Sequence, residues 1–66
     1  MNITVNGEPR QLPDAASLQQ LLAELELAGK RLAVELNEQI VPRGQFDHTR
    51  LHDGDVVEIV HAIGGG

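Results

Sequence analysis

Cysteine, tryptophan and tyrosine are absent from this 66-residue sequence, and phenylalanine occurs once. Without cysteine the chain can form no disulfide, thiolate metal site or cysteine nucleophile. With a single aromatic side chain it offers almost no surface on which nucleic-acid bases could stack. Lys and Arg number 5 against 10 Asp and Glu, a formal net charge of −5, whereas binding to phosphate backbones needs clustered cations. We therefore expect no nucleic-acid partner.

Long apolar runs are also missing, so the sequence predicts no membrane span and no membrane partner. The first residues lack the basic and apolar regions of a secretory signal. A chain that uses no cysteine suits a reducing cytoplasm. Because so short a chain buries only about 60% of its unfolded surface, it has one small core and little room for a catalytic pocket. We expect a cytoplasmic single domain, monomeric when free, that is not an enzyme.

A β-hairpin is predicted at the start of the chain. Ile3 and Val5 alternate with polar residues, as in a half-buried strand, and Asn6-Gly7 tolerates the positive φ angles of a type I′ turn. The returning strand is expected over residues 8–12. Pro9 places that strand at a sheet edge, because proline cannot donate a ladder hydrogen bond.

The period then changes to that of a helix. Four leucines at i, i+3, i+4 and i+7 form one apolar face: Leu18, Leu21, Leu22 and Leu25. Ser17 and Gln20 have the spacing of a capping box, with Asp14 as the alternative N-cap one turn earlier. Gly29 stands where a left-handed C-terminal cap is expected, followed by two basic residues.

Three further strands are predicted after the helix. Residues 32–36 and 39–41 form two of them around a turn at Asn37-Glu38, and residues 43–52 have no clear period. The Asp53-Gly54-Asp55 turn precedes the most apolar β-forming run, residues 56–60, which we expect to lie centrally beside the first strand. The prediction is an α+β fold with a mixed four- to five-stranded sheet wrapped on one helix, spanning residues 1–61, and a flexible glycine tail over residues 62–66.

Few residues in the domain itself indicate chemistry. His48 and His52 are four residues apart, a spacing that brings two metal ligands together only on a helix, and here they lie in a predicted loop with no support from His61. The acidic residues near position 54 do not match a calcium loop, so no metal is expected. On the last strand, Val57 and Ile59 are expected inward. The outward residues Val56, Glu58 and Val60 then form a candidate partner surface. Phe46 is equally compatible with the core and with an interface.

The chain closes on Ala62-Ile63-Gly64-Gly65-Gly66. Three residues without Cβ atoms form a thread thin enough for a narrow tunnel, and six residues reach about 20 Å when extended. The carboxylate of Gly66 is unhindered at its α-carbon. Such an end suits a group that is delivered into the active site of another protein, although a glycine tail can equally be an idle terminus.

Taken together, these segments give the sequence a resemblance to the ThiS family of sulfur carriers. The resemblance rests on residues 3–8, 33–37, 40–43 and 51–60 and on the terminal Gly65-Gly66. It implies the ubiquitin-like β-grasp fold. It also implies that Gly66 is adenylated and converted to a thiocarboxylate, while Ile63, Gly64 and Gly65 enter the partner's active site.

The partners that the resemblance implies are a ubiquitin-activating-enzyme-like adenylyltransferase that consumes ATP, a cysteine desulfurase as the sulfur source, and thiazole synthase. No cofactor is expected on the chain itself. Three alternatives remain open from the sequence: a molybdopterin-synthase-type sulfur carrier, a ubiquitin-like protein modifier, and an interaction module with an idle tail.

Overall fold

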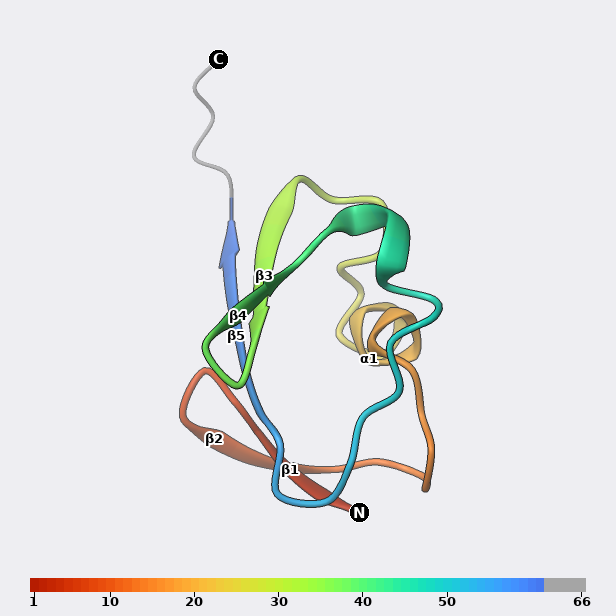
Figure 1. Ribbon diagram of the computed structural model, residues 1–66, viewed down its shortest axis with the longest axis vertical. Helices are drawn as coiled ribbons and strands as arrows, with labels where there is room; N and C mark the ends of the chain where they lie inside the picture. Colours follow the sequence, from red (N-terminus) through yellow and green to blue (C-terminus); the bar gives the residue numbers. More distant parts are fainter. Residues whose placement is uncertain (62–66) are drawn as a thin grey trace.

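A computed structural model describes residues 1–61 of the chain. One mixed sheet of five strands, in the order β2-β1-β5-β3-β4, packs on a single helix (Figure 1). In chain order the elements are β1 (Asn2–Val5), β2 (Glu8–Gln11), α1 (Leu18–Glu24), β3 (Leu32–Leu36), β4 (Gln39–Val41), the 3-10 helix η1 (Arg43–Gln45) and β5 (Val56–His61). The predicted α+β sheet on one helix is confirmed.

The last strand lies in the middle of the sheet. β5 runs parallel to β1 and antiparallel to β3, with Val5 opposite Val57 on one side and Leu36 opposite the same valine on the other. Both backbone edges of β5 are therefore paired. The apolar sequence of β5 suits this central position. The predicted central placement beside the first strand is therefore confirmed.

Two tight turns set the register of the hairpins. Asn6 and Gly7 have φ angles of 49° and 83°, and Asn37 and Glu38 have φ angles of 50° and 70°. Both turns thus take positive φ at their two central residues, the condition for a type I′ connection that matches the twist of the strands. β2 lies at the edge, with Pro9 opposite Thr4, as its proline predicted.

The start of α1 follows the capping-box prediction. The Ser17 hydroxyl accepts a hydrogen bond from the Gln20 N–H at 3.1 Å, and the Gln20 side-chain oxygen accepts one from the Ser17 N–H at 2.7 Å. Each residue satisfies a backbone donor that the first turn of a helix leaves free. Asp14, the alternative cap, lies outside the helix.

The end of α1 differs from the prediction. The helix ends with Leu25 as its C-cap, not at Gly29, because Glu26 takes a left-handed φ of 61°. The Glu26 N–H donates to the Ala23 carbonyl at 3.0 Å, and the Leu27 N–H donates to the Leu22 carbonyl at 2.8 Å. These two backbone hydrogen bonds are the Schellman pattern. In a longer helix Leu27 would point about 180° away from Leu18. Ending the helix early lets Leu27 pack against the core.

The core fills the space between the sheet and α1. The connection between β4 and β5 covers one side of this core. The Leu18 N–H donates to the Thr49 carbonyl at 2.8 Å, and the Leu51 N–H donates to the Ala16 carbonyl at 2.9 Å. The buried apolar residues are Ile3, Val5, Leu12, Ala16, Leu18, Leu21, Leu22, Val34, Phe46, Leu51, Val57 and Ile59. Within residues 1–61, no helix has the length and apolar character needed to cross a membrane.

Candidate functional site: the outer sheet face and the end of β5

The side chains of β5 alternate between the core and the outside. Val57 and Ile59 are buried at 0% and 6% exposure, whereas Val56 and Val60 are exposed at 43% and 59%. Glu58 lies between these two valines on the exposed side. The predicted orientation of the strand is confirmed, so the sheet has one face on α1 and one exposed face.

Neighbouring strands enlarge this open face beyond what the sequence analysis proposed. Glu35 lies directly opposite Glu58, and Ile40 lies opposite Glu35 with 73% of its surface exposed. We call the five exposed or half-exposed residues Glu35, Ile40, Val56, Glu58 and Val60 the outer face. The alternation of residues 32–36 could have indicated that Glu35 points outward. The pairing of Ile40 with Glu35 depends instead on strand register. The outer face therefore combines two opposed carboxylates with three β-branched apolar side chains.

The side chain of Asn6 holds the end of β5. β1 turns away after Val5, which would leave the backbone of Ile59 without a strand partner on that side. Instead the Ile59 N–H donates to Asn6 Oδ1 at 2.7 Å, and Asn6 Nδ2 donates to the Ile59 carbonyl at 3.3 Å. An amide side chain supplies one donor and one acceptor, as a peptide unit does. Asn6 thus continues the pairing of β5 where β1 has ended.

The second turn asparagine holds the beginning of β5. Val56 donates its N–H to Asn37 Oδ1 at 2.9 Å, and Asn37 donates its backbone N–H to the Val56 carbonyl at 2.8 Å. Asn37 Nδ2 also donates to the Asp55 carboxylate at 3.0 Å. From the sequence, both asparagines were predicted to lie in turns, with no further contact. Their second role could not be found from local pattern, because Ile59 lies 53 residues from Asn6.

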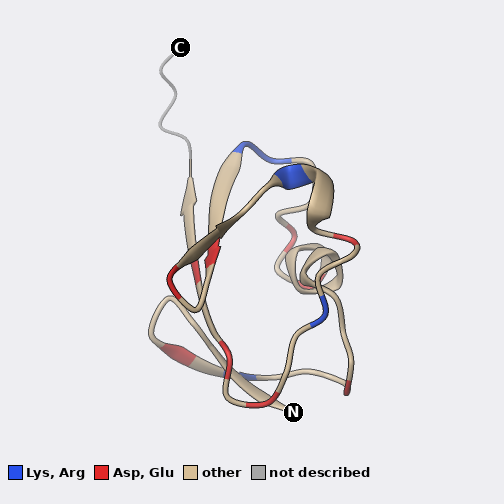
Figure 2. Ribbon diagram, in the orientation of Figure 1, with Lys and Arg blue, Asp and Glu red and all other residues tan. Residues whose placement is uncertain are grey.

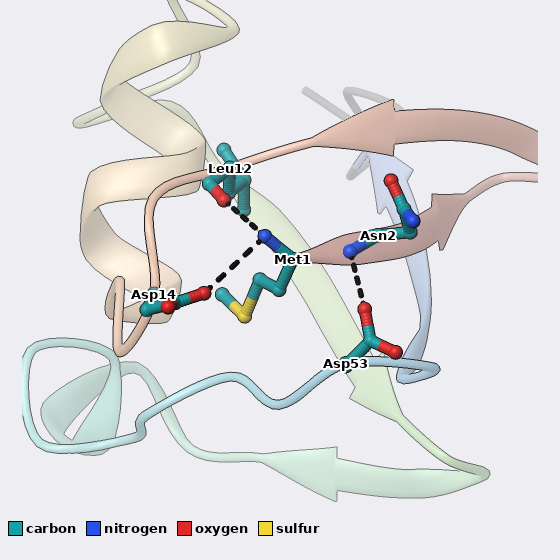
Figure 3. Close-up of polar contacts among 5 residues, drawn as sticks. All are labelled: Met1, Asn2, Leu12, Asp14 and Asp53. Carbon is teal, nitrogen blue, oxygen red and sulfur yellow. Dashed lines mark hydrogen bonds and ion pairs between the residues drawn. The ribbon is translucent and has the colours of Figure 1, made fainter.

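The acidic turn before β5 has a structural role. Asp53 accepts a hydrogen bond from the Asn2 N–H at 2.6 Å, beside the contacts of the Met1 amino group with the Leu12 carbonyl at 2.7 Å and with Asp14 at 3.4 Å (Figure 3). Asp55 accepts from the His52 N–H at 2.8 Å. These two carboxylates are used to bind backbone amides, in keeping with the plain turn that the sequence predicted.

The structure corrects the candidate interface role of Phe46. Its ring is buried at 5% exposure in the same cluster as the helix leucines, so it contributes to the core. The residue follows η1, and Gln19 of the helix donates its N–H to the Phe46 carbonyl at 3.0 Å. The sequence left core and interface equally open because residues 43–52 have no periodicity that assigns a face.

The three histidines make separate contacts. His48 and His52 expose 72% and 80% of their side chains and lie 3.5 Å and 3.9 Å from Asp47 and Asp55 respectively. His61 ends β5 opposite Leu32. Among residues 1–61, no three His, Asp or Glu side chains come together as a metal-ligand set.

Positive charge is concentrated at one end of this acidic molecule. Figure 2 shows two basic segments at the end at which β5 finishes, one leading into β3 and one at η1. Lys30 and Arg31 directly precede β3, and Arg43 is the first residue of η1. Arg43 donates from Nη2 to the Lys30 carbonyl at 2.8 Å, which joins the two segments. Because Leu32, next to Arg31, pairs with His61, this basic end adjoins the end of β5. The net charge alone gave no sign of this separation.

The remaining predicted site residues lie outside the described part of the chain. They are Ile63, Gly64, Gly65 and Gly66, within the predicted tail of residues 62–66. Within residues 1–61, the outer face, the basic end and the asparagine-held β5 form the candidate site.

Comparison with known proteins identifies relatives over nearly the whole chain. The model of the ThiS family matches residues 3–66. The sulfur carrier protein ThiS of Bacillus subtilis is 42% identical over 53 residues, which cover 80% of each chain. The crystal structure of the thiamine biosynthesis protein ThiS from Geobacter metallireducens superposes with a TM-score of 0.86, at 39% identity and over 100% of both chains.

A second kind of relative is much longer. The thiazole synthase of Paramagnetospirillum magneticum is 39% identical over 66 residues, which are 100% of this chain and 20% of that protein. The chain therefore spans about a fifth of the length of this relative. A segment similar to the chain is thus present within a protein named as a thiazole synthase.

Proposed function

Because the chain belongs to the ThiS family, we propose that it is a sulfur carrier that supplies thiazole synthase during thiamin biosynthesis. The observation that carries the proposal is the family match over residues 3–66, which includes the glycine-rich end. The segment similar to this chain within a thiazole synthase supports that enzyme as the sulfur acceptor.

The chemistry begins at the Gly66 carboxylate. A carboxylate is a poor electrophile, so an adenylyltransferase of the ubiquitin-activating type joins its oxygen to the α-phosphorus of ATP and releases pyrophosphate. The acyl-adenylate has AMP as a good leaving group. A cysteine desulfurase takes sulfur from cysteine as a persulfide, and the outer sulfur of that persulfide displaces AMP to give an acyl disulfide. A thiol then reduces this S–S bond and releases the terminal thiocarboxylate, which passes its sulfur to thiazole synthase. The chain is the co-substrate of these enzymes, and ATP is used by the activating partner.

Residues Ile63, Gly64 and Gly65 enter the partner's active site in this proposal, since glycine adds no side-chain width. The outer face supplies the docking area. Its two opposed carboxylates, Glu35 and Glu58, repel each other across the strands, so a partner cation placed between them gains attraction to both. The exposed side chain of Ile40 beside this pair adds apolar area. We therefore propose that an activating-enzyme surface with a basic residue among apolar ones binds the outer face.

Intact-mass spectrometry tests the carrier function. The chain is incubated with ATP, the cognate adenylyltransferase and a desulfurase supplied with cysteine. We expect a mass gain equal to the replacement of one oxygen by sulfur, with fragment ions that locate the change at Gly66. The chain lacking Gly66 is the matched control, because it keeps the folded residues 1–61 and loses the reacting group.

An unchanged mass in the presence of partners that are active on another carrier would contradict the proposal. Covalent products of higher mass, linked through Gly66 to lysine side chains, would instead show a protein modifier. Transfer to molybdopterin synthase with none to thiazole synthase would assign the chain to the other sulfur-carrier pathway.

A further inference from the structure

A groove of about 220 Å³ lies between the inner side of β2 and the segment that follows α1. It reaches along β5 to His61, the last described residue. Its wall combines apolar side chains with charged and polar groups, most of them from the first hairpin. The lining residues that matter here are Val5, Glu8, Arg10, Leu25, Leu27 and Ile59.

Strand register places a cation inside this groove. Arg10 lies opposite Ile3, and Glu8 lies opposite Val5, with Ile3 and Val5 buried at 3% and 8% exposure. Cross-strand partners share one face of a sheet. The Arg10 side chain therefore leaves β2 on the side of the sheet that packs on α1, where the central strands carry apolar residues.

The guanidinium of Arg10 is not fully satisfied there. Its Nε is buried and has no hydrogen-bond partner. None of the ion pairs formed within residues 1–61 includes Arg10. A buried donor without an acceptor is destabilising, and such groups are rare in folded proteins. An acceptor supplied from outside would remove this cost.

We propose that the groove binds a carboxylate side chain, an Asp or Glu next to an apolar residue, on a protein partner of this chain. When the Arg10 side chain turns so that its buried Nε faces the groove, a carboxylate can accept hydrogen bonds from Nε and a terminal nitrogen together, the paired geometry that guanidinium groups favour. Leu25, Leu27 and Ile59 cover the apolar residue beside it. Glu8 adds one negative charge to the lining, which disfavours a phosphate dianion more than a carboxylate monoanion.

The groove lies next to the last residues of β5. A partner anchored on Arg10 also contacts Ile59 and His61, and Ile59 is the residue whose backbone Asn6 holds. The contact would fix the direction in which β5 presents the following residues. We take this partner to be the adenylyltransferase, an identification that rests on the proposed function, whereas the binding of a carboxylate in the groove does not depend on it.

A ligand titration tests the groove without any partner protein. The ¹⁵N-labelled chain is titrated with 4-methylpentanoate, which joins a carboxylate to an apolar body, while NMR follows the Arg10 Nε–H and the amides of Leu27 and Ile59. We expect saturable shifts at all three, lost in Arg10→Gln and unchanged in the control Arg50→Gln. Equal shifts with 4-methylpentanol, stronger binding of inorganic phosphate, or no shift at Arg10 would each overturn the proposal.

A binding measurement extends the test to the adenylyltransferase. Arg10→Gln is expected to bind about tenfold more weakly or worse, mainly through faster dissociation, with Arg10→Lys between it and the parent chain. The urea midpoint of Arg10→Gln should be no lower than that of the parent chain, which separates docking from folding. Normal affinity of Arg10→Gln in an active carrier would overturn the groove alone. A positive titration in a chain that acquires no sulfur would instead refute only the carrier function.

Discussion

Replacing Asn6 with glycine tests whether this side chain holds the end of β5. Glycine accepts the φ of 49° at position 6, so the turn is retained and only the amide is removed. Two hydrogen bonds to Ile59 disappear, at 2.7 Å and 3.3 Å, and the Ile59 N–H loses its partner in a residue that is 6% exposed. Leaving a buried backbone group unpaired costs about 1–3 kcal/mol, so we expect Asn6→Gly to lower the free energy of unfolding by about 2 kcal/mol.

Urea denaturation measures this loss of free energy, and the m-value should be unchanged. For a chain of this size, the melting temperature should fall by about 8–16 °C. Amide hydrogen exchange locates it: the Ile59 N–H should exchange faster relative to Val34, a buried residue of β3. Asn37→Gly is the matched control, because it removes the equivalent amide from exposed bonds at the start of β5 and should cost about 1 kcal/mol. A loss below about 0.5 kcal/mol in Asn6→Gly, or unchanged protection of Ile59, would refute the reasoning.

Three other changes have defined outcomes. Glu26→Gly should raise the free energy of unfolding by about 1 kcal/mol, since residue 26 is exposed and holds a left-handed φ of 61°, and Glu26→Ala should give no such gain in the same urea titration. Gly7→Ala should lower it by about 1 kcal/mol or more, because φ is +83° although nothing lies within 4 Å of an added Cβ; an unchanged midpoint would contradict the turn assignment. Glu58→Arg should weaken calorimetric binding to the adenylyltransferase about tenfold, whereas Glu38→Arg, in the β3–β4 turn and not one of the outer-face residues, should leave the affinity unchanged.

Local signals in the sequence determined the elements of this fold. Asn6-Gly7 forms the predicted turn because these two residue types accept positive φ, and Ser17 with Gln20 starts the helix because their side chains satisfy its free amides. Alternation along residues 56–60 correctly placed Val57 inside. Each of these outcomes depends on residues within a few positions of one another, which is why the sequence alone could predict them.

Tertiary structure decided the features that depend on distant residues. α1 ends before Gly29 because Leu27 gains a place in the core that a longer helix would deny it. Phe46 is buried because the irregular connection folds over the helix. Each of these outcomes depends on how distant segments pack, which no local period of the sequence records.

The candidate site divides in the same way. The outward residues of β5 could be predicted from the sequence, because strand alternation sets them, and the glycine end could be singled out there by residue type. The surroundings of the site could not be predicted, since the pairing of Glu35 with Glu58, the hold of Asn6 on Ile59 and the inward side chain of Arg10 each require strand register. Register joins residues from distant parts of the chain, so it exists only once the sheet has formed.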